Sequence, residues 1–101
     1  MSSTEPILTI SVAANLLGLH PRTLMLYERE GLITPYRTKT NRRLFSIKDL
    51  ERLQFLKYLT QQEGINLSGA RKIFEAIVYA EREGINLKKT LFPSFKVEKL
   101  L

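Results

Sequence analysis

Apolar residues recur every three or four positions in four stretches of the chain, which predicts four helices. The first is expected at Val12–Leu17 with Ser11 as its N-cap, after a β-prone lead-in at residues 7–10. The second is expected to run from Arg22 to Glu30, and Pro21 suits its first position. Two short helices joined by about four residues that include a glycine form a helix-turn-helix arrangement.

After the second helix the pattern changes from helical to extended. Tyr36–Thr38 and Arg43–Phe45 are expected to pair as a small hairpin, with Asn41 as the loop residue that best tolerates a left-handed turn. A helix-turn-helix followed by a hairpin and a further helix is the element order of a winged helix. In such folds the second helix presents its N-terminal end to the major groove, and the wing places cations on the adjacent backbone.

Two longer helices follow the hairpin. One is expected at Ile47–Glu63, beginning at a capping box of Ser46 and Asp49, and the other at about Gly69–Glu83. A helix with so little partner surface in a small domain favours a dimer interface, although its stripe could also pack within its own subunit. The expected interface comprises Leu67, Ala70, Ile73, Phe74, Ile77 and Ala80.

A glycine follows each predicted helix, and glycine commonly ends a helix. The pentapeptide Glu-Gly-Ile-Asn-Leu occurs twice, at 63–67 and 83–87, and both copies stand at helix-stop positions. Five residues are too short a match to establish a structural repeat.

Charge is concentrated in one segment of the chain. The 101 residues carry 16 Lys and Arg against 10 Asp and Glu, a net charge of +6. Residues 31–48 hold five of these bases and no acid, whereas the rest of the chain is nearly balanced. A basic loop is a common way to reach a phosphate backbone, and a merely solvated loop is the alternative.

Composition excludes several classes of protein. There is no cysteine, which excludes a disulfide framework, a cysteine-based zinc site and thiolate catalysis. No apolar run approaches the ~18–20 residues needed to cross a bilayer, and residues 1–6 do not resemble a signal peptide. A cytoplasmic, nucleoid-associated protein without a cofactor or metal is expected.

Enzymatic function is not expected either. The sequence has no phosphate-binding glycine pattern, no nucleophile paired with histidine and no metal-ligand spacing. Its carboxylates, Glu28 among them, stand where caps and surface charges are expected. The single histidine, His20, is better placed to cap or border the second helix than to bind metal, with DNA contact as the alternative.

The element order and the basic loop together indicate a DNA-binding surface. Its candidates lie at the start of the second helix, one turn further along it, and on the wing. They are His20, Arg22, Thr23, Tyr27, Arg37, Lys39, Arg42 and Arg43. The ring of Tyr27 is expected to pack inward while its hydroxyl reaches a phosphate.

At family level the sequence resembles the MerR-type DNA-binding domain. The motifs that carry the resemblance are Thr9–Ala14, Gly18–Leu24, Tyr27–Ile33, Pro35–Thr38, Arg43–Ser46 and Asp49-Leu50. His20–Thr23 and Glu63–Gly69 further resemble the heat-shock repressor branch, HspR. The resemblance covers about residues 7–80.

The resemblance implies a mostly α fold, a winged helix-turn-helix at 7–64 with a dimerisation helix at 67–83 and a short tail at 84–101. It further implies a homodimer joined by an antiparallel coiled coil, an inverted-repeat operator, and repression with the chaperone DnaK as co-repressor. Arg22, Tyr27, Arg37 and Arg43 match the family's DNA-contacting positions. The chain departs from the family at Met25-Leu26, where an arginine and an aromatic residue are usual.

The tail combines an apolar, proline-containing stretch with lysines on both sides. Such a stretch suits the groove of a chaperone, and the expected contacts are Leu91, Phe92 and Phe95. The alternative is that Phe92 and Phe95 fold back on the core.

Two other functions remain open from the sequence. One is a MerR-like protein-binding adaptor or chaperone modulator that does not bind DNA, although the cationic wing argues against it. The other is an excisionase-like architectural DNA binder, against which the apolar stripe of the fourth helix speaks.

Overall fold

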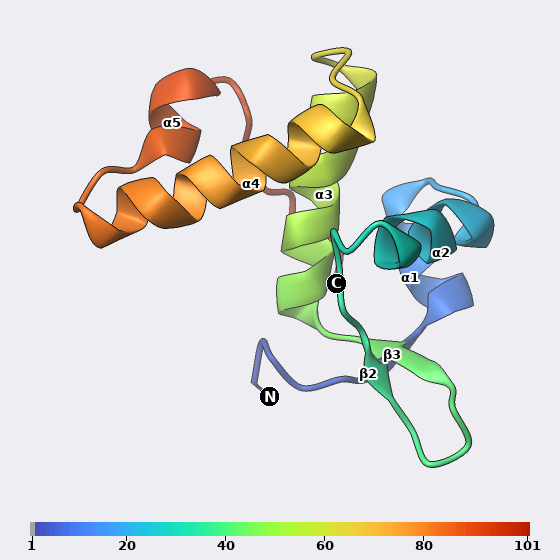
Figure 1. Cartoon of the computed structure of the whole chain (residues 1–101). Coiled ribbons are helices and arrows are strands. Elements are labelled where there is room, and N and C mark those ends of the chain that lie inside the picture. The colour runs from blue at the N-terminus through green and yellow to red at the C-terminus, as the bar shows by residue number, and fades with distance from the viewer. Residues whose placement is uncertain (1) are drawn as a thin grey trace. The chain divides into compact units, whose positions relative to one another are not determined.

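The structure is a computed structural model and describes residues 2–101 (Figure 1). Its helices and strands are short, and every predicted element is present. Their order is β1 (Leu8–Thr9), α1 (Ile10–Leu17), α2 (Pro21–Arg29), β2 (Tyr36–Arg37), β3 (Arg43–Phe45), α3 (Ile47–Gln61), α4 (Leu67–Arg82) and α5 (Leu87–Leu91). This confirms the mostly helical winged helix-turn-helix fold.

The helix-turn-helix begins two residues earlier than the sequence predicts. Thr9, not Ser11, is the N-cap of α1, and its Oγ1 accepts a hydrogen bond from the Val12 N–H at 3.3 Å. The expectation for Ser11 was therefore wrong, because the β-prone Thr9 already has the extended backbone that a cap requires. Gly18 ends α1 in the left-handed conformation, as predicted.

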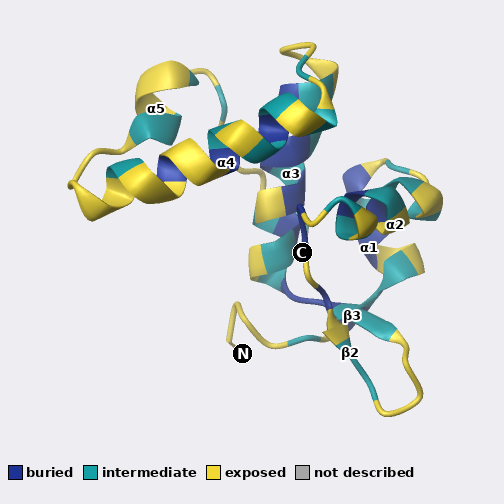
Figure 2. Ribbon diagram, viewed as in Figure 1, coloured by how far each residue is buried: buried dark blue, intermediate teal, exposed yellow. Residues whose placement is uncertain are grey.

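The wing is part of a three-stranded antiparallel sheet in the order β1-β3-β2. Leu8 pairs with Phe45 and Tyr36 pairs with Leu44, so β3 is the central strand. The hairpin is closed by the Thr38 N–H, which donates to the Arg42 carbonyl at 2.9 Å, and Asn41 has the predicted positive φ of 65°. Figure 2 shows the loop between β2 and β3 as mostly exposed.

Helix α3 begins at the predicted capping box. The Ser46 N–H donates to Asp49 Oδ2 at 2.9 Å, and the Asp49 N–H donates to Ser46 Oγ at 3.0 Å. Buried leucines and Phe55 follow one another along the helix on more than one side. This is why α3 can supply core residues to both compact units of the chain.

The chain divides into two compact units within α3. One extends to Gln54 and includes Glu98–Leu101, and the other is Phe55–Val97. The first holds the helix-turn-helix and the sheet, around a core that includes Leu24, Phe45 and Leu53. The second holds the end of α3, then α4, α5 and most of the tail.

The repeated pentapeptide builds the same local structure twice. In each copy the glycine has positive φ, 66° at Gly64 and 75° at Gly84, and ends the preceding helix. The asparagine then caps the next helix: Asn66 Oδ1 accepts the Gly69 N–H at 2.8 Å, and Asn86 Oδ1 accepts the Lys89 N–H at 3.1 Å. The second copy thereby begins α5, a helix that the sequence analysis did not predict.

None of the helices in the described part of the chain has the length and apolar character required to span a membrane.

Candidate nucleic-acid interface

The first turn of α2 is open to solvent and capped by a histidine. His20 is the N-cap, and its Nδ1 accepts the backbone N–H of Arg22 at 3.0 Å. A ring that accepts at Nδ1 carries its proton on Nε2, which leaves an outward N–H donor. His20 precedes α2 as its N-cap, and Arg22 and Thr23 lie in the first turn. The side chains of His20 and Arg22 are exposed, and that of Thr23 is half-buried.

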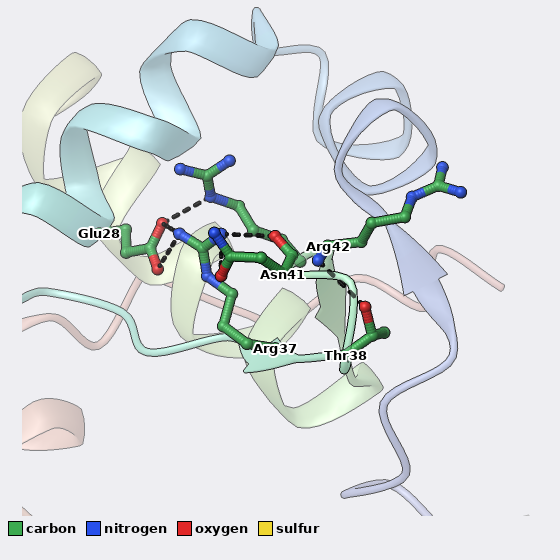
Figure 3. A network of polar contacts seen from close by, with 6 residues as sticks. Glu28, Arg37, Thr38, Asn41 and Arg42 are labelled. Carbon is green, nitrogen blue, oxygen red and sulfur yellow. Dashed lines mark hydrogen bonds and ion pairs between the residues drawn. The ribbon is translucent and has the colours of Figure 1, made fainter.

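A single carboxylate connects both strands of the wing to α2. Glu28 lies on α2 and receives hydrogen bonds from Arg37 on β2 and Arg43 on β3 (Figure 3). Arg37 Nη2 lies 3.2 and 3.1 Å from the two carboxylate oxygens, and Arg43 Nε lies 2.6 Å from Oε1. Charge-assisted bonds of this kind are roughly twice as strong as neutral ones.

The environment of Glu28 keeps it ionised. Burial by itself would raise its pKa, but hydrogen bonds from Arg43 and Arg37, together with their charges, outweigh that effect and lower the pKa below the ordinary 4.5. Glu28 is therefore an anion at neutral pH, and it offsets part of the positive charge of the two arginines.

Arg37 extends this network to the tip of the hairpin. Its Nη1 donates to the Asn41 carbonyl at 2.9 Å and lies 3.4 Å from Asn41 Oδ1. Asn41 sits in the left-handed turn, and the Arg42 N–H donates to Thr38 Oγ1 at 3.0 Å. One arginine thus joins α2, β2 and the loop.

The remaining wing cations are directed to solvent. Lys39 and Arg42 are exposed, and within residues 2–101 neither side chain forms an ion pair. Figure 3 shows Arg42 pointing away from Glu28. The side chains of Arg37 and Arg43 stay partly exposed, at 35% and 25%, while each is bound to Glu28.

Tyr27 is a core residue with one polar end. Its overall exposure is 4%, as the inward-packed ring predicts. This burial agrees with the predicted packing of the ring, and the phosphate contact of the hydroxyl stays a prediction.

The role of Glu28 differs from the ordinary cap or surface charge that the sequence predicts for it. The available signal was that this acid precedes a segment, 31–48, that contains bases and no acid. Arg52 is a second residue that was not predicted from the sequence. Its Nε donates to the Leu32 carbonyl at 2.7 Å, and this bond connects α3 to the segment that follows α2. In the described part of the chain no three His, Cys, Asp or Glu residues gather as a metal site would require.

Comparison with known proteins identifies the family of the chain. The family model for MerR HTH family regulatory proteins matches residues 8–77. This chain belongs to the MerR family. The match begins in β1 and ends within α4, so it takes in the whole helix-turn-helix and wing.

Two relatives are named as a heat shock protein and as a transcriptional regulator. The chain is 47% identical over 75 residues to a protein of Streptomyces coelicolor described as "Putative heat shock protein HspR". The matched residues make up 74% of this chain and 50% of that protein. It is 38% identical over 70 residues to the HTH-type transcriptional regulator GlnR of Bacillus anthracis, covering 69% of this chain and 54% of the relative. The chain thus spans about half the length of these relatives.

A solved MerR structure shares the fold. The crystal structure of HiNmlR, a MerR family regulator lacking the sensor domain and bound to promoter DNA, has a TM-score of 0.70 and 29% sequence identity. The similarity covers 84% of this chain and 64% of that one.

The Glu28 network predicts a specific dependence of stability on pH. Because the pKa of Glu28 is lowered in the folded chain, its contribution to stability is complete above the ordinary value of 4.5 and is lost as the pH falls through the lowered pKa. Glu28→Gln is expected to reduce the free energy of unfolding by roughly 1–3 kcal/mol at pH 7. Urea denaturation of both proteins should show this difference narrow as the pH falls below about 4.

Glu5→Gln is the matched control, because Glu5 is exposed and forms no ion pair among residues 2–101. A Glu28→Gln difference that stays constant down to the lowest pH would contradict the ionised network.

Proposed function

We propose that this MerR-family chain is a sequence-specific DNA-binding transcriptional regulator that reads the major groove with the first turn of α2. The observation that carries the proposal is the coupling of that helix to a cationic wing through Glu28. His20 and Arg22 offer exposed donors at the helix start, and Lys39 and Arg42 offer unpaired cations on the wing. Supporting this, the MerR neighbour HiNmlR is bound to promoter DNA.

The candidate residues divide by the contact they are suited to make. His20, Arg22 and Thr23 lie where a recognition helix contacts base edges. Lys39 and Arg42 are suited to phosphates, because an exposed, flexible cation gains from counterion release. Arg37 and Arg43 stay partly exposed while bound to Glu28, and the Tyr27 hydroxyl adds one further phosphate contact.

A homodimer is the second part of the proposal. Ala70, Phe74 and Ile77, which the sequence assigned to the dimer interface, are buried within the Phe55–Val97 unit, where Phe74 packs edge-on against Phe55 at 5.7 Å. Being buried already, these three side chains have little surface left to bury against a second copy. The outward face of α4 instead exposes Val78 by 48% and Tyr79 by 71%.

We assign the interface between copies to the sides of α4 that are not buried, which carry Val78 and Tyr79 and, beside the buried stripe, the half-buried Leu67, Ile73 and Ala80. A two-fold dimer places its recognition helices on two symmetric half-sites, so the operator is expected to be an inverted repeat. Large exposed apolar side chains on one helix are typical of such an interface.

Repression of the HspR type is the third part, supported by the 47% identity to the Streptomyces coelicolor protein. The chaperone DnaK is the corresponding co-repressor candidate, with the tail as its contact. In this tail Leu91 is exposed by 54%, whereas Phe92 and Phe95 are half-buried. Of the three predicted contacts, Leu91 is thus the one most accessible to a chaperone in the folded chain.

The DNA-binding proposal predicts the effect of removing the open wing cations. Lys39→Ala with Arg42→Ala should weaken binding to all DNA fragments and reduce the slope of log affinity against log salt by about two. Fluorescence anisotropy with a fragment selected from genomic DNA measures both quantities. Lys99→Ala, which removes an exposed charge outside the wing, is the control and should leave the slope unchanged.

A wild-type protein that selects no common sequence and shows no salt dependence would contradict DNA binding and favour the adaptor alternative.

The dimer proposal predicts that Val78→Asp and Tyr79→Asp give folded monomers, because neither residue is buried in the single chain, at 48% and 71% exposure. Sedimentation analysis should show the shift in mass, and operator affinity should fall by roughly tenfold or more as the second half-site contact is lost. Glu81→Asp, an exposed conservative change on the same helix, serves as the control. Dimers that persist in both aspartate variants would place the interface elsewhere.

A further inference from the structure

Four aromatic rings from two distant parts of the sequence meet in the Phe55–Val97 unit. Phe55 and Tyr58 belong to α3, whereas Phe92 and Phe95 belong to the tail. The Phe92 ring centroid lies 5.6 Å from that of Phe55 and 6.1 Å from that of Tyr58. Phe95 lies 5.1 Å from each. Each tail ring therefore packs against both α3 rings within the range of favourable aromatic pairs.

A lysine adds a charge to the same contact. Lys88 Nζ lies 4.5 Å from the ring centroid of Phe55 and 5.2 Å from that of Phe95, so the ammonium group interacts with a ring from each partner. Lys88, Phe92 and Phe95 reach one surface because α5 ends at Leu91 and the chain then turns. In that turn the Phe95 N–H donates to the Phe92 carbonyl at 3.1 Å.

The end of the tail is anchored separately in the other unit. The side-chain amide of Gln54 donates to the Glu98 carbonyl at 2.9 Å and accepts the Glu98 N–H at 2.8 Å. Both hydrogen bonds join the Gln54 side chain to backbone atoms of Glu98. They therefore do not depend on which side chain stands at position 98. The tail is thus fixed by a few separate contacts, while Leu91, Pro93 and Ser94 remain exposed.

We infer that Phe55 and Tyr58 form a peptide-docking surface on α3, which the chain's own tail occupies as a removable ligand. The ligand it recognises is a peptide with a lysine followed by aromatic rings four and seven residues later. A protein that takes Phe92 and Phe95 into its own groove must compete with Phe55 and Tyr58 for the same two rings. This inference concerns the Phe55–Val97 unit and does not depend on DNA binding.

The competition can be measured with the tail supplied as a separate molecule. The probe is a fluorescein-labelled synthetic peptide of residues 86–101, titrated by anisotropy against full-length wild-type protein and the full-length variant Phe92→Ala/Phe95→Ala. In the wild type the attached tail competes at an effective concentration of about 1 mM. The variant, whose surface is vacated, should therefore bind the peptide roughly tenfold or more tightly than the wild type.

A peptide that carries the same two alanines is the matched control and should bind neither protein. Equal affinity for both proteins, or no binding to a folded variant, would overturn the inference.

A second measurement covers the case in which the variant does not fold. Wild-type protein with fluorinated phenylalanine gives fluorine resonances for its five Phe residues. Unlabelled peptide at several millimolar should move the Phe92 and Phe95 signals towards their solvent-exposed positions and leave Phe45 in place. Unchanged signals would overturn removable docking. If the peptide dissociates a wild-type dimer, the tail that occupies the surface belongs to a second copy. That result would overturn occupation by the chain's own tail.

Discussion

The ion-paired contact between Glu28 and two arginines is the interaction on which the proposed DNA-binding surface depends. Strands β2 and β3 are only two and three residues long, and such a hairpin has little stability of its own. Glu28 connects both strands to α2, and Arg37 carries the connection on to Asn41 in the loop. Helix α2 and the wing are thereby connected through an acid placed among bases.

This arrangement has a consequence for how the basic charge is used. The five bases of residues 31–48 do not form a uniform cationic surface. Arg37 and Arg43 are partly neutralised and held by Glu28, whereas Lys39 and Arg42 are exposed and form no ion pair within residues 2–101. Donors held in place favour recognition of one register on DNA, and exposed cations supply attraction that is independent of sequence.

Local signals were sufficient to predict most of the fold. Pro21 at a helix start, Asn41 in the left-handed turn and the box of Ser46 and Asp49 all act over a few residues, and the structure confirms each. The sequence failed where partners are distant along the chain. Glu28 contacts Arg43, which is 15 residues away in the sequence, and Phe55 contacts Phe92, which lies beyond α4. Neither contact produces a periodic pattern of residue types in the sequence. The second Glu-Gly-Ile-Asn-Leu copy did carry the information for α5, because its asparagine caps that helix as the first copy caps α4.

The central claim is that Glu28 positions the wing for sequence recognition and does more than neutralise charge. Its most direct test is the ratio of specific to non-specific DNA affinity, measured at one salt concentration for the wild type and Glu28→Gln. Removal of an acid should strengthen non-specific binding, while loss of the fixed wing should weaken binding to the operator, so the ratio should fall. An equal gain in both affinities, with the ratio unchanged, would contradict the account.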